Sequence, residues 1–72
     1  MATPRAVELL SYFAGIAPVG EPVRFSRSEV MAALRLDRNT YHRCLNHLVA
    51  ERHVRRIATR VLIVLRRPEE SP

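Results

Sequence analysis

Apolar residues recur at helical intervals over three stretches of the chain. The first stretch follows Thr3-Pro4, where an N-cap residue precedes proline at the first helical position, and is expected to end at Pro18. The second begins at Ser26-Arg27-Ser28-Glu29, whose S-x-x-E form is typical of a capping box. The apolar positions of these two helices are Ala6, Val7, Leu10, Phe13, Ala14 and Ala17, and then Val30, Met31, Ala33 and Leu34.

The third helical stretch carries the most regular pattern. Asp37 precedes it and is expected to cap its first turn. Its apolar stripe has the i, i+3, i+4, i+7, i+8 spacing of a core-facing helix and consists of Tyr41, Cys44, Leu45, Leu48 and Val49. Only about three residues separate the second and third helices, which is the connection expected of a helix-turn-helix.

Alternating and β-branched segments predict three short strands. Residues 23–25 are expected at a sheet edge, because Pro22 at their start has no N–H to donate. Residues 54–58 and 61–66 are expected to pair as a hairpin with its tip at Thr59-Arg60. The predicted fold class is therefore α+β, in the order helix-strand-helix-helix-strand-strand.

Length and composition fit one small domain. The 72 residues are 47% hydrophobic, enough for one compact core, and the single cysteine excludes an internal disulfide. We expect this domain to span residues 1–67, with a polar tail over residues 68–72. No apolar run is long enough to cross a bilayer, and the N-terminal segment lacks the apolar region of a signal peptide. These features predict a soluble, cytoplasmic protein.

Positive charge is concentrated in the second half of the chain. The formal net charge is +5, and all twelve basic side chains are arginine. Residues 38–67 hold eight arginines and one carboxylate, Glu51. A GC-rich coding bias would explain arginine in place of lysine, but it does not explain the clustering. The clustering indicates a polyanionic partner, since guanidinium groups pair bidentately with phosphate and with guanine.

The polar side of the third helix carries no acidic residue. If the apolar stripe faces the core, the outward positions are Arg38, Asn39, His42, Arg43, Asn46 and His47. The arginines would pair with guanine O6 and N7, and the asparagines with adenine N6 and N7. Each such pair contributes roughly 1–3 kcal/mol of base discrimination. The alternative is a solvated polar face, but an exposed face without acids favours contact with bases or phosphates.

Several further residues are candidates for phosphate contact. Arg27 and Thr40 lie in the first turns of the second and third helices, where free backbone N–H groups bind anions. For Thr40, local support of the helix cap is the alternative role. Ser26 and Ser28 are candidates to join Arg27, with the N-cap as the alternative role for one of them. Arg56 and Arg60 belong to the predicted hairpin and would contact the DNA backbone or enter a narrow minor groove. The remaining hairpin arginines are expected to be solvated: Arg55, Arg66 and Arg67.

The segment RSEVMAALRLDRNTYHRCLNHLVAERHVRR, residues 27–56, resembles the core of MarR-type bacterial regulators in the winged helix-turn-helix superfamily. Leu45 and Leu48 match the packing leucines of the family's recognition helix. The family usually has glycine in the turn that follows; here His53 is expected in that left-handed position. The resemblance implies that the third helix enters a major groove and that the hairpin, or wing, lies along the adjacent backbone or minor groove.

Metal binding and catalysis are not expected. The candidate ligands His42, Cys44, His47 and His53 lack C-x-x-C or H-x₃-H spacing, and Cys44 falls on the core stripe. A buried thiol is inert, and a chain of this length has little room for a substrate cleft. We therefore expect no enzyme activity, metal or cofactor.

A homodimer or a cooperative oligomer on DNA is expected, because one domain of this size covers only a few base pairs. An apolar patch for dimerisation would combine outward residues of the last strand with residues of the first helix. These are Leu62 and Val64, with Leu9, Tyr12 and Ile16.

The function predicted from the sequence is sequence-specific binding of double-stranded DNA by a small transcriptional regulator, such as a repressor, at the nucleoid. The recognition helix is expected over residues 38–51 and the wing over residues 54–66. No small-molecule effector is expected. Two alternatives stay open: a winged-helix protein-interaction module in a transcription or replication assembly, and a DNA-bending architectural or recombination-directionality factor.

Overall fold

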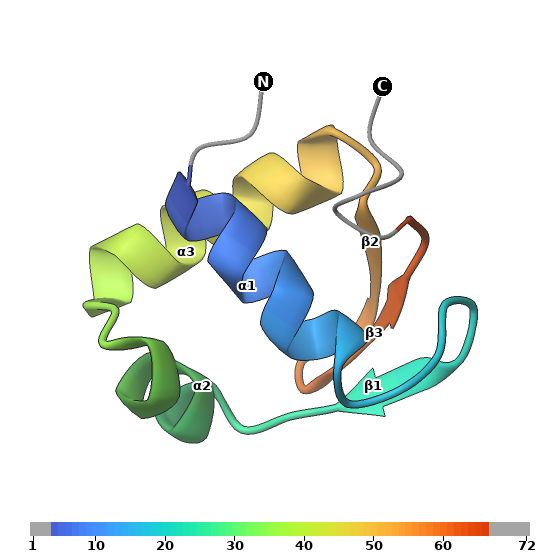
Figure 1. The fold of residues 1–72 in the computed structure, drawn as a ribbon, viewed down its shortest axis with the longest axis horizontal. Coiled ribbons are helices and arrows are strands. Elements are labelled where there is room, and N and C mark those ends of the chain that lie inside the picture. The colour runs from blue at the N-terminus through green and yellow to red at the C-terminus, as the bar shows by residue number, and fades with distance from the viewer. Residues whose placement is uncertain (1–3, 67–72) are drawn as a thin grey trace.

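The computed structural model describes residues 4–66 and folds them into three helices and one three-stranded antiparallel sheet (Figure 1). In chain order the elements are α1 (Pro4–Ala14), β1 (Pro22–Arg24), α2 (Arg27–Leu34), α3 (Arg38–Ala50), β2 (Val54–Ala58) and β3 (Val61–Val64). The α+β class and the predicted order of elements are confirmed. The predicted Thr3 cap, Arg67 and the polar tail lie outside the described residues. No helix within residues 4–66 is both long and apolar enough to cross a lipid bilayer.

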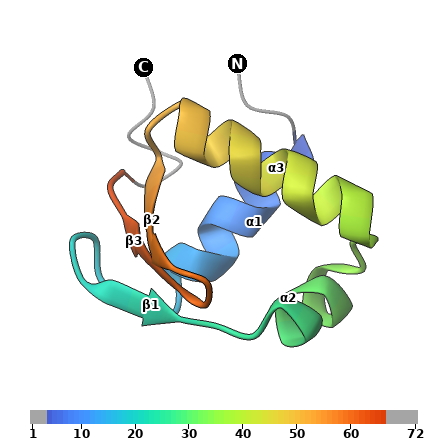
Figure 2. The same cartoon turned by 180° about the vertical axis from the view of Figure 1, so that it is seen from behind.

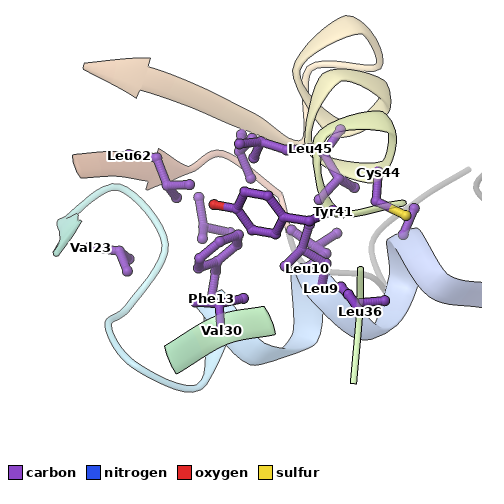
Figure 3. Close-up of a cluster of buried hydrophobic side chains, with 14 residues drawn as sticks. Leu9, Leu10, Phe13, Val23, Val30, Leu36, Tyr41, Cys44, Leu45 and Leu62 are labelled. Carbon is purple, nitrogen blue, oxygen red and sulfur yellow. The ribbon is translucent and has the colours of Figure 1, made fainter. Parts of the chain in front are cut away.

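Helix α1 is the central element of the core and contacts α2, α3 and β3. Its buried side consists of Ala6, Leu9, Leu10 and Phe13. The Phe13 ring centroid lies 5.0 Å from that of Phe25, which ties the helix to the segment that follows β1. Figure 3 shows how these side chains meet core residues from the other helices and from β1 and β3.

The central strand of the sheet is β3, since the strand order is β1-β3-β2. Leu62 and Val64 face the helices and are fully buried, whereas Val61 and Ile63 lie on the outer face and are partly exposed. The prediction that Leu62 and Val64 point outward as a dimer patch is therefore wrong, and Leu9, its partner on α1, is also 0% exposed. The sequence predicts that alternate residues of the strand point to opposite faces of the sheet. The register of the sheet then determines which of the two faces packs against the helices.

Two predicted helix boundaries are wrong, because hydrogen bonds at the helix ends decide them. Helix α1 ends at Ala14 and not at Pro18. The Gly15 N–H still bonds to the Ser11 carbonyl four residues back, but the Ile16 N–H bonds to the Phe13 carbonyl three residues back, as in a 3₁₀ turn. After α3, the left-handed residue is Arg52, with φ of 61°, and not His53. The His53 N–H instead bonds back to the Leu48 carbonyl, which is the longer hydrogen bond of a Schellman motif.

Three apolar positions expected in the core lie at its margin or outside it. Ala33 on α2 is exposed. Val7 on α1 is 38% exposed and Val49 on α3 is 37% exposed. The other members of the α3 stripe are buried as predicted: Tyr41, Cys44, Leu45 and Leu48.

The β2–β3 hairpin turns at Thr59 and Arg60, as predicted, but β3 ends at Val64 and not at residue 66. Arg56 pairs with Leu62 and Ala58 pairs with Val61, so the register shifts at Ile57. Within the described residues, positive φ among non-glycine residues occurs only at Arg35 and Arg52, so the turn is not the left-handed type usual in two-residue hairpins. The irregular register accommodates this turn.

The N-termini of α2 and α3 differ in how they are capped. Before α3, the Asp37 carboxylate accepts a hydrogen bond of 2.6 Å from the Thr40 N–H. Before α2, Ser26 has the extended backbone of an N-cap residue, but its side chain makes no capping hydrogen bond. The predicted capping box is therefore not formed, and the first turn of α2 keeps its backbone donors for other partners.

Removing the Asp37 cap is expected to lower the melting temperature by a few degrees at pH 7, because Asp37→Ala loses the acceptor for Thr40. Asp37→Ser keeps an acceptor and should stay near wild type. Hydrogen bonds from the Thr40 side chain and then from its backbone lower the pKa of Asp37, and the Arg43 charge adds to this.

The pH dependence of this effect follows from the lowered pKa. The carboxylate stabilises the fold above the ordinary aspartate pKa, and this contribution is lost as the pH falls through the folded-state value. Melting temperatures of wild type and Asp37→Ala, measured by circular dichroism, should therefore converge in acid. A gap that stays constant to low pH would contradict the assignment of this cap.

Candidate nucleic-acid interface

The outward side of α3 presents the six residues expected there, and we call this surface the α3 face. Arg38, Asn39, Arg43 and Asn46 are exposed, and the histidines at 42 and 47 are partly exposed. The helical period fixes this arrangement, since Tyr41, Cys44, Leu45 and Leu48 fill the opposite side. None of the six carries negative charge, so the face presents hydrogen-bond donors and cationic groups to solvent.

The two histidines of the α3 face differ in environment. His42 lies edge-on to the Tyr41 ring, with centroids 5.4 Å apart. His47 turns its Nε2 atom inward, where it has no hydrogen-bond partner within the described residues. It therefore suits base contact less well than its neighbours on the face.

A third histidine, His53, follows α3 and lies outside the α3 face. Burial lowers the pKa of His53, and the Arg66 charge adds to this, so His53 is neutral at pH 7.

A hollow of about 230 Å³ lies beside the α3 face, between the first turn of α2, α3 and the hairpin turn. Figure 2 shows this side of the molecule, with α3 above and the hairpin turn directed toward α2. The lining contains three exposed arginines and no carboxylate, and we call it the basic hollow. Its lining residues are Ser26, Arg27, Ser28, Tyr41, His42, Leu45, Arg56, Thr59 and Arg60. Because His42 belongs to both, the basic hollow and the α3 face form one continuous surface.

Tyr41 is a core residue whose side chain also lines the basic hollow. The residue is only 2% exposed, and its hydroxyl makes no hydrogen bond to any described residue. In Figure 3 the hydroxyl oxygen points away from the α3 backbone. Burial raises the pKa of Tyr41, while the nearby charges of Arg56 and Arg27 act in the opposite direction. The hydroxyl is therefore protonated at neutral pH and can donate a hydrogen bond.

The structure brings together four of the predicted site residues that are far apart in the sequence. Arg27, His42, Arg56 and Arg60 all line the basic hollow. Thr40 does not join them: its N–H is occupied by Asp37, so the capping role that was its alternative is present. The remaining predicted residues lie along the α3 face: Arg38, Asn39, Arg43, Asn46 and His47.

Tyr41 was missed as a site residue because its position predicted only packing. Leucine or phenylalanine would fill the same core position, so the signal in the sequence is the polar hydroxyl itself at an otherwise apolar position. Thr59 was predicted only as part of the hairpin tip, and its place in the lining depends on how α2 approaches the hairpin. Ser26 and Ser28, expected beside Arg27, also line the hollow.

The other hairpin arginines lie away from this surface or are engaged elsewhere. Arg55 pairs with Ile63, on the opposite sheet face from the Arg56–Leu62 pair. Arg66 donates a hydrogen bond to the Glu51 carbonyl at the C-terminus of α3. No group of three or more histidine, cysteine, aspartate or glutamate side chains suited to a metal ion occurs within residues 4–66.

Comparison with known proteins found no match, whether to family models, to curated proteins or to solved structures. The function of the surface is therefore argued from its geometry and charge.

Proposed function

We propose that this protein binds double-stranded DNA through the α3 face and the hairpin turn, as a small sequence-specific regulator of the winged helix-turn-helix type. The observation that carries the proposal is the continuous surface formed by the α3 face and the basic hollow, which contains no carboxylate. A duplex offers closely spaced phosphates beside base edges, and such a surface complements both.

In this proposal α3 is the recognition helix and enters the major groove. Arg38 and Arg43 are exposed and would read guanine, and Asn39 and Asn46 would read adenine. The β2–β3 hairpin would be the wing, with Arg60 at its turn against the sugar-phosphate backbone. Phosphate contacts would position the protein, and the α3 side chains would supply sequence preference.

Binding as a homodimer or cooperatively to half-sites fits the small size of the unit, whose principal extents are 27 × 25 × 19 Å. The same surface would also serve a DNA-bending architectural factor. The two roles would differ in DNA deformation, which circular permutation of the binding site measures.

A protein-interaction module is the second candidate, and one feature favours it. An open groove of about 520 Å³ lies between the end of α3 and β2, and it shares Arg56 with the lining of the basic hollow. Val49 and Leu65 give it an exposed apolar lining. The arginines beside them would favour an acidic partner, and such a partner would leave the α3 face unused.

Selection from random-sequence duplexes at several salt concentrations tests the proposal. We expect an enriched motif for wild type. Arg43→Ala should lose preference at one base position and weaken binding to the selected site by about 5- to 150-fold, as expected for a bidentate contact. Arg60→Ala should weaken binding to all sequences similarly and reduce the salt slope by about one.

If neither substitution changes affinity at low salt, the α3 face does not bind the duplex. If wild type enriches no motif and binds weakly, the protein-interaction module becomes the better explanation.

A further inference from the structure

The basic hollow differs from an ordinary positive surface in having a polar group at its buried side. The Tyr41 hydroxyl belongs to a residue that is 2% exposed, and no described side chain or backbone carbonyl accepts its proton. Tyr41 belongs to the lining of the hollow, so its hydroxyl is available there as a donor to a bound group.

The charges around the hydroxyl define what that bound group is. Arg27 and Arg56 act electrostatically on Tyr41, and Arg60 completes the lining. No carboxylate lines the hollow. Glu29 lines an adjoining depression together with Arg24 and Arg60. The bound group is therefore an acceptor with negative charge.

The first turn of α2 adds backbone donors at the same place. Helix α2 has eight residues, and its N-cap side chain makes no hydrogen bond. The Val30 N–H bonds to the Ser26 carbonyl, and no described residue accepts from the N–H groups of Arg27, Ser28 and Glu29. The N-terminus of a helix attracts anions through such free N–H groups and the helix dipole. At α3, by contrast, Asp37 already supplies the negative group.

The size of the hollow suits one tetrahedral anion with its remaining hydration. Its volume is about 230 Å³. One water molecule needs only about 10–15 Å³, so the hollow has room for a larger polyatomic group. Most of the lining is serine, threonine and arginine, whose hydroxyl and guanidinium groups donate hydrogen bonds to phosphate oxygens.

We propose that the basic hollow holds one phosphate group of the DNA backbone, with the Tyr41 hydroxyl donating a hydrogen bond to a phosphate oxygen. Arg27, Arg56 and Arg60 neutralise the charge, and the first turn of α2 donates backbone hydrogen bonds. The inference rests on the proposed function for the source of the phosphate. It adds a specific position: one phosphate fixes the orientation of α3 relative to the groove, so the core residue Tyr41 has a binding role.

The variant that isolates the inference is Tyr41→Phe, which removes one oxygen atom and leaves the ring. Thermal stability should not decrease, because the hydroxyl donates no hydrogen bond within the described residues. Tyr12→Phe is the matched control, since Tyr12 lies on α1 and does not line the hollow. Affinity for duplex DNA should fall about 10-fold for Tyr41→Phe, as expected for one hydrogen bond to a charged acceptor, and stay unchanged for Tyr12→Phe.

The salt dependence separates the hydroxyl from the charges. Tyr41→Phe should leave the slope of log K against log salt unchanged, because it removes no charge. Arg27→Ala should reduce the slope by about 0.9. In a duplex in which single phosphates are replaced by neutral methylphosphonates, wild type should lose most affinity at one phosphate, and Tyr41→Phe should lose less than wild type at that same phosphate.

A titration with inorganic phosphate, followed by amide chemical shifts, distinguishes the source of the anion. Duplex binding that is weakened by Tyr41→Phe and sensitive to one methylphosphonate supports the inference as stated. Salt-dependent duplex binding that Tyr41→Phe does not change overturns the inference and leaves the proposed function standing. If no duplex binds, but inorganic phosphate changes the amide chemical shifts of Arg27 and Ser28 in wild type and not in Tyr41→Phe, the hollow binds free phosphate and the proposed function fails. If neither ligand binds, both proposals fail.

Discussion

Phe13→Ala is expected to leave most of the protein unfolded at room temperature. Phe13 is fully buried, and its ring contacts Phe25 at 5.0 Å and Tyr12 at 6.0 Å between centroids. Truncating a buried phenylalanine costs about 3–5 kcal/mol. The total stability of a domain below about 70–80 residues rarely exceeds about 3–5 kcal/mol, so this one substitution removes most of it.

Urea denaturation followed by circular dichroism measures this effect. Ile16→Ala is the matched control, because Ile16 follows α1 and is 48% exposed; it should change stability by less than about 0.5 kcal/mol. A Phe13→Ala variant with the denaturation midpoint of wild type would show that α1 does not pack against the sheet as described.

Raising the salt concentration is expected to have the largest effect on DNA binding. Five exposed arginines lie on the proposed surface: Arg27, Arg38, Arg43, Arg56 and Arg60. If each of the five guanidinium charges counts as one neutralised phosphate charge, whether it contacts a base edge or shares the phosphate in the basic hollow, the slope of log K against log salt is about −4.5, and a rise from about 50 to 200 mM salt weakens binding roughly 500-fold.

Fluorescence anisotropy with a labelled duplex measures this slope, and the free energy of unfolding should be followed in the same buffers. A stable fold across the series ensures that loss of binding does not reflect unfolding. A slope near zero would mean that phosphate contacts do not drive the association, and the interpretation of the arginine cluster would be wrong.

Local periodicity was sufficient to predict the elements and the α3 face. The spacing of Tyr41, Cys44, Leu45 and Leu48 places the polar residues of α3 on the opposite side without any knowledge of the rest of the fold. The errors at the helix ends arose from local hydrogen bonds, and the error in the last strand arose from longer-range contacts. The register of the sheet buried Leu62.

The basic hollow could not be predicted in the same way. It requires α2, α3 and the hairpin turn to approach one another, and its lining residues come from positions 26–28, 41–45 and 56–60. Arg27, Arg56 and Arg60 were selected one by one from charge and from the family resemblance. Their meeting around the Tyr41 hydroxyl depends on tertiary packing.

In the proposed interface, DNA binding depends on one particular surface and not simply on the net positive charge of the protein. Arg55 and Arg56 test it most directly, since they are adjacent in β2, both exposed, and on opposite faces of the sheet. Arg56 lines the basic hollow and Arg55 does not. Alanine at either position removes the same charge, so net charge alone predicts equal effects.

The decisive measurement is the salt dependence of duplex affinity for wild type, Arg56→Ala and Arg55→Ala. We predict that Arg56→Ala weakens binding and reduces the slope by about 0.9, whereas Arg55→Ala stays close to wild type in both. Equal losses for the two variants, or a larger loss for Arg55→Ala, would contradict the proposed interface.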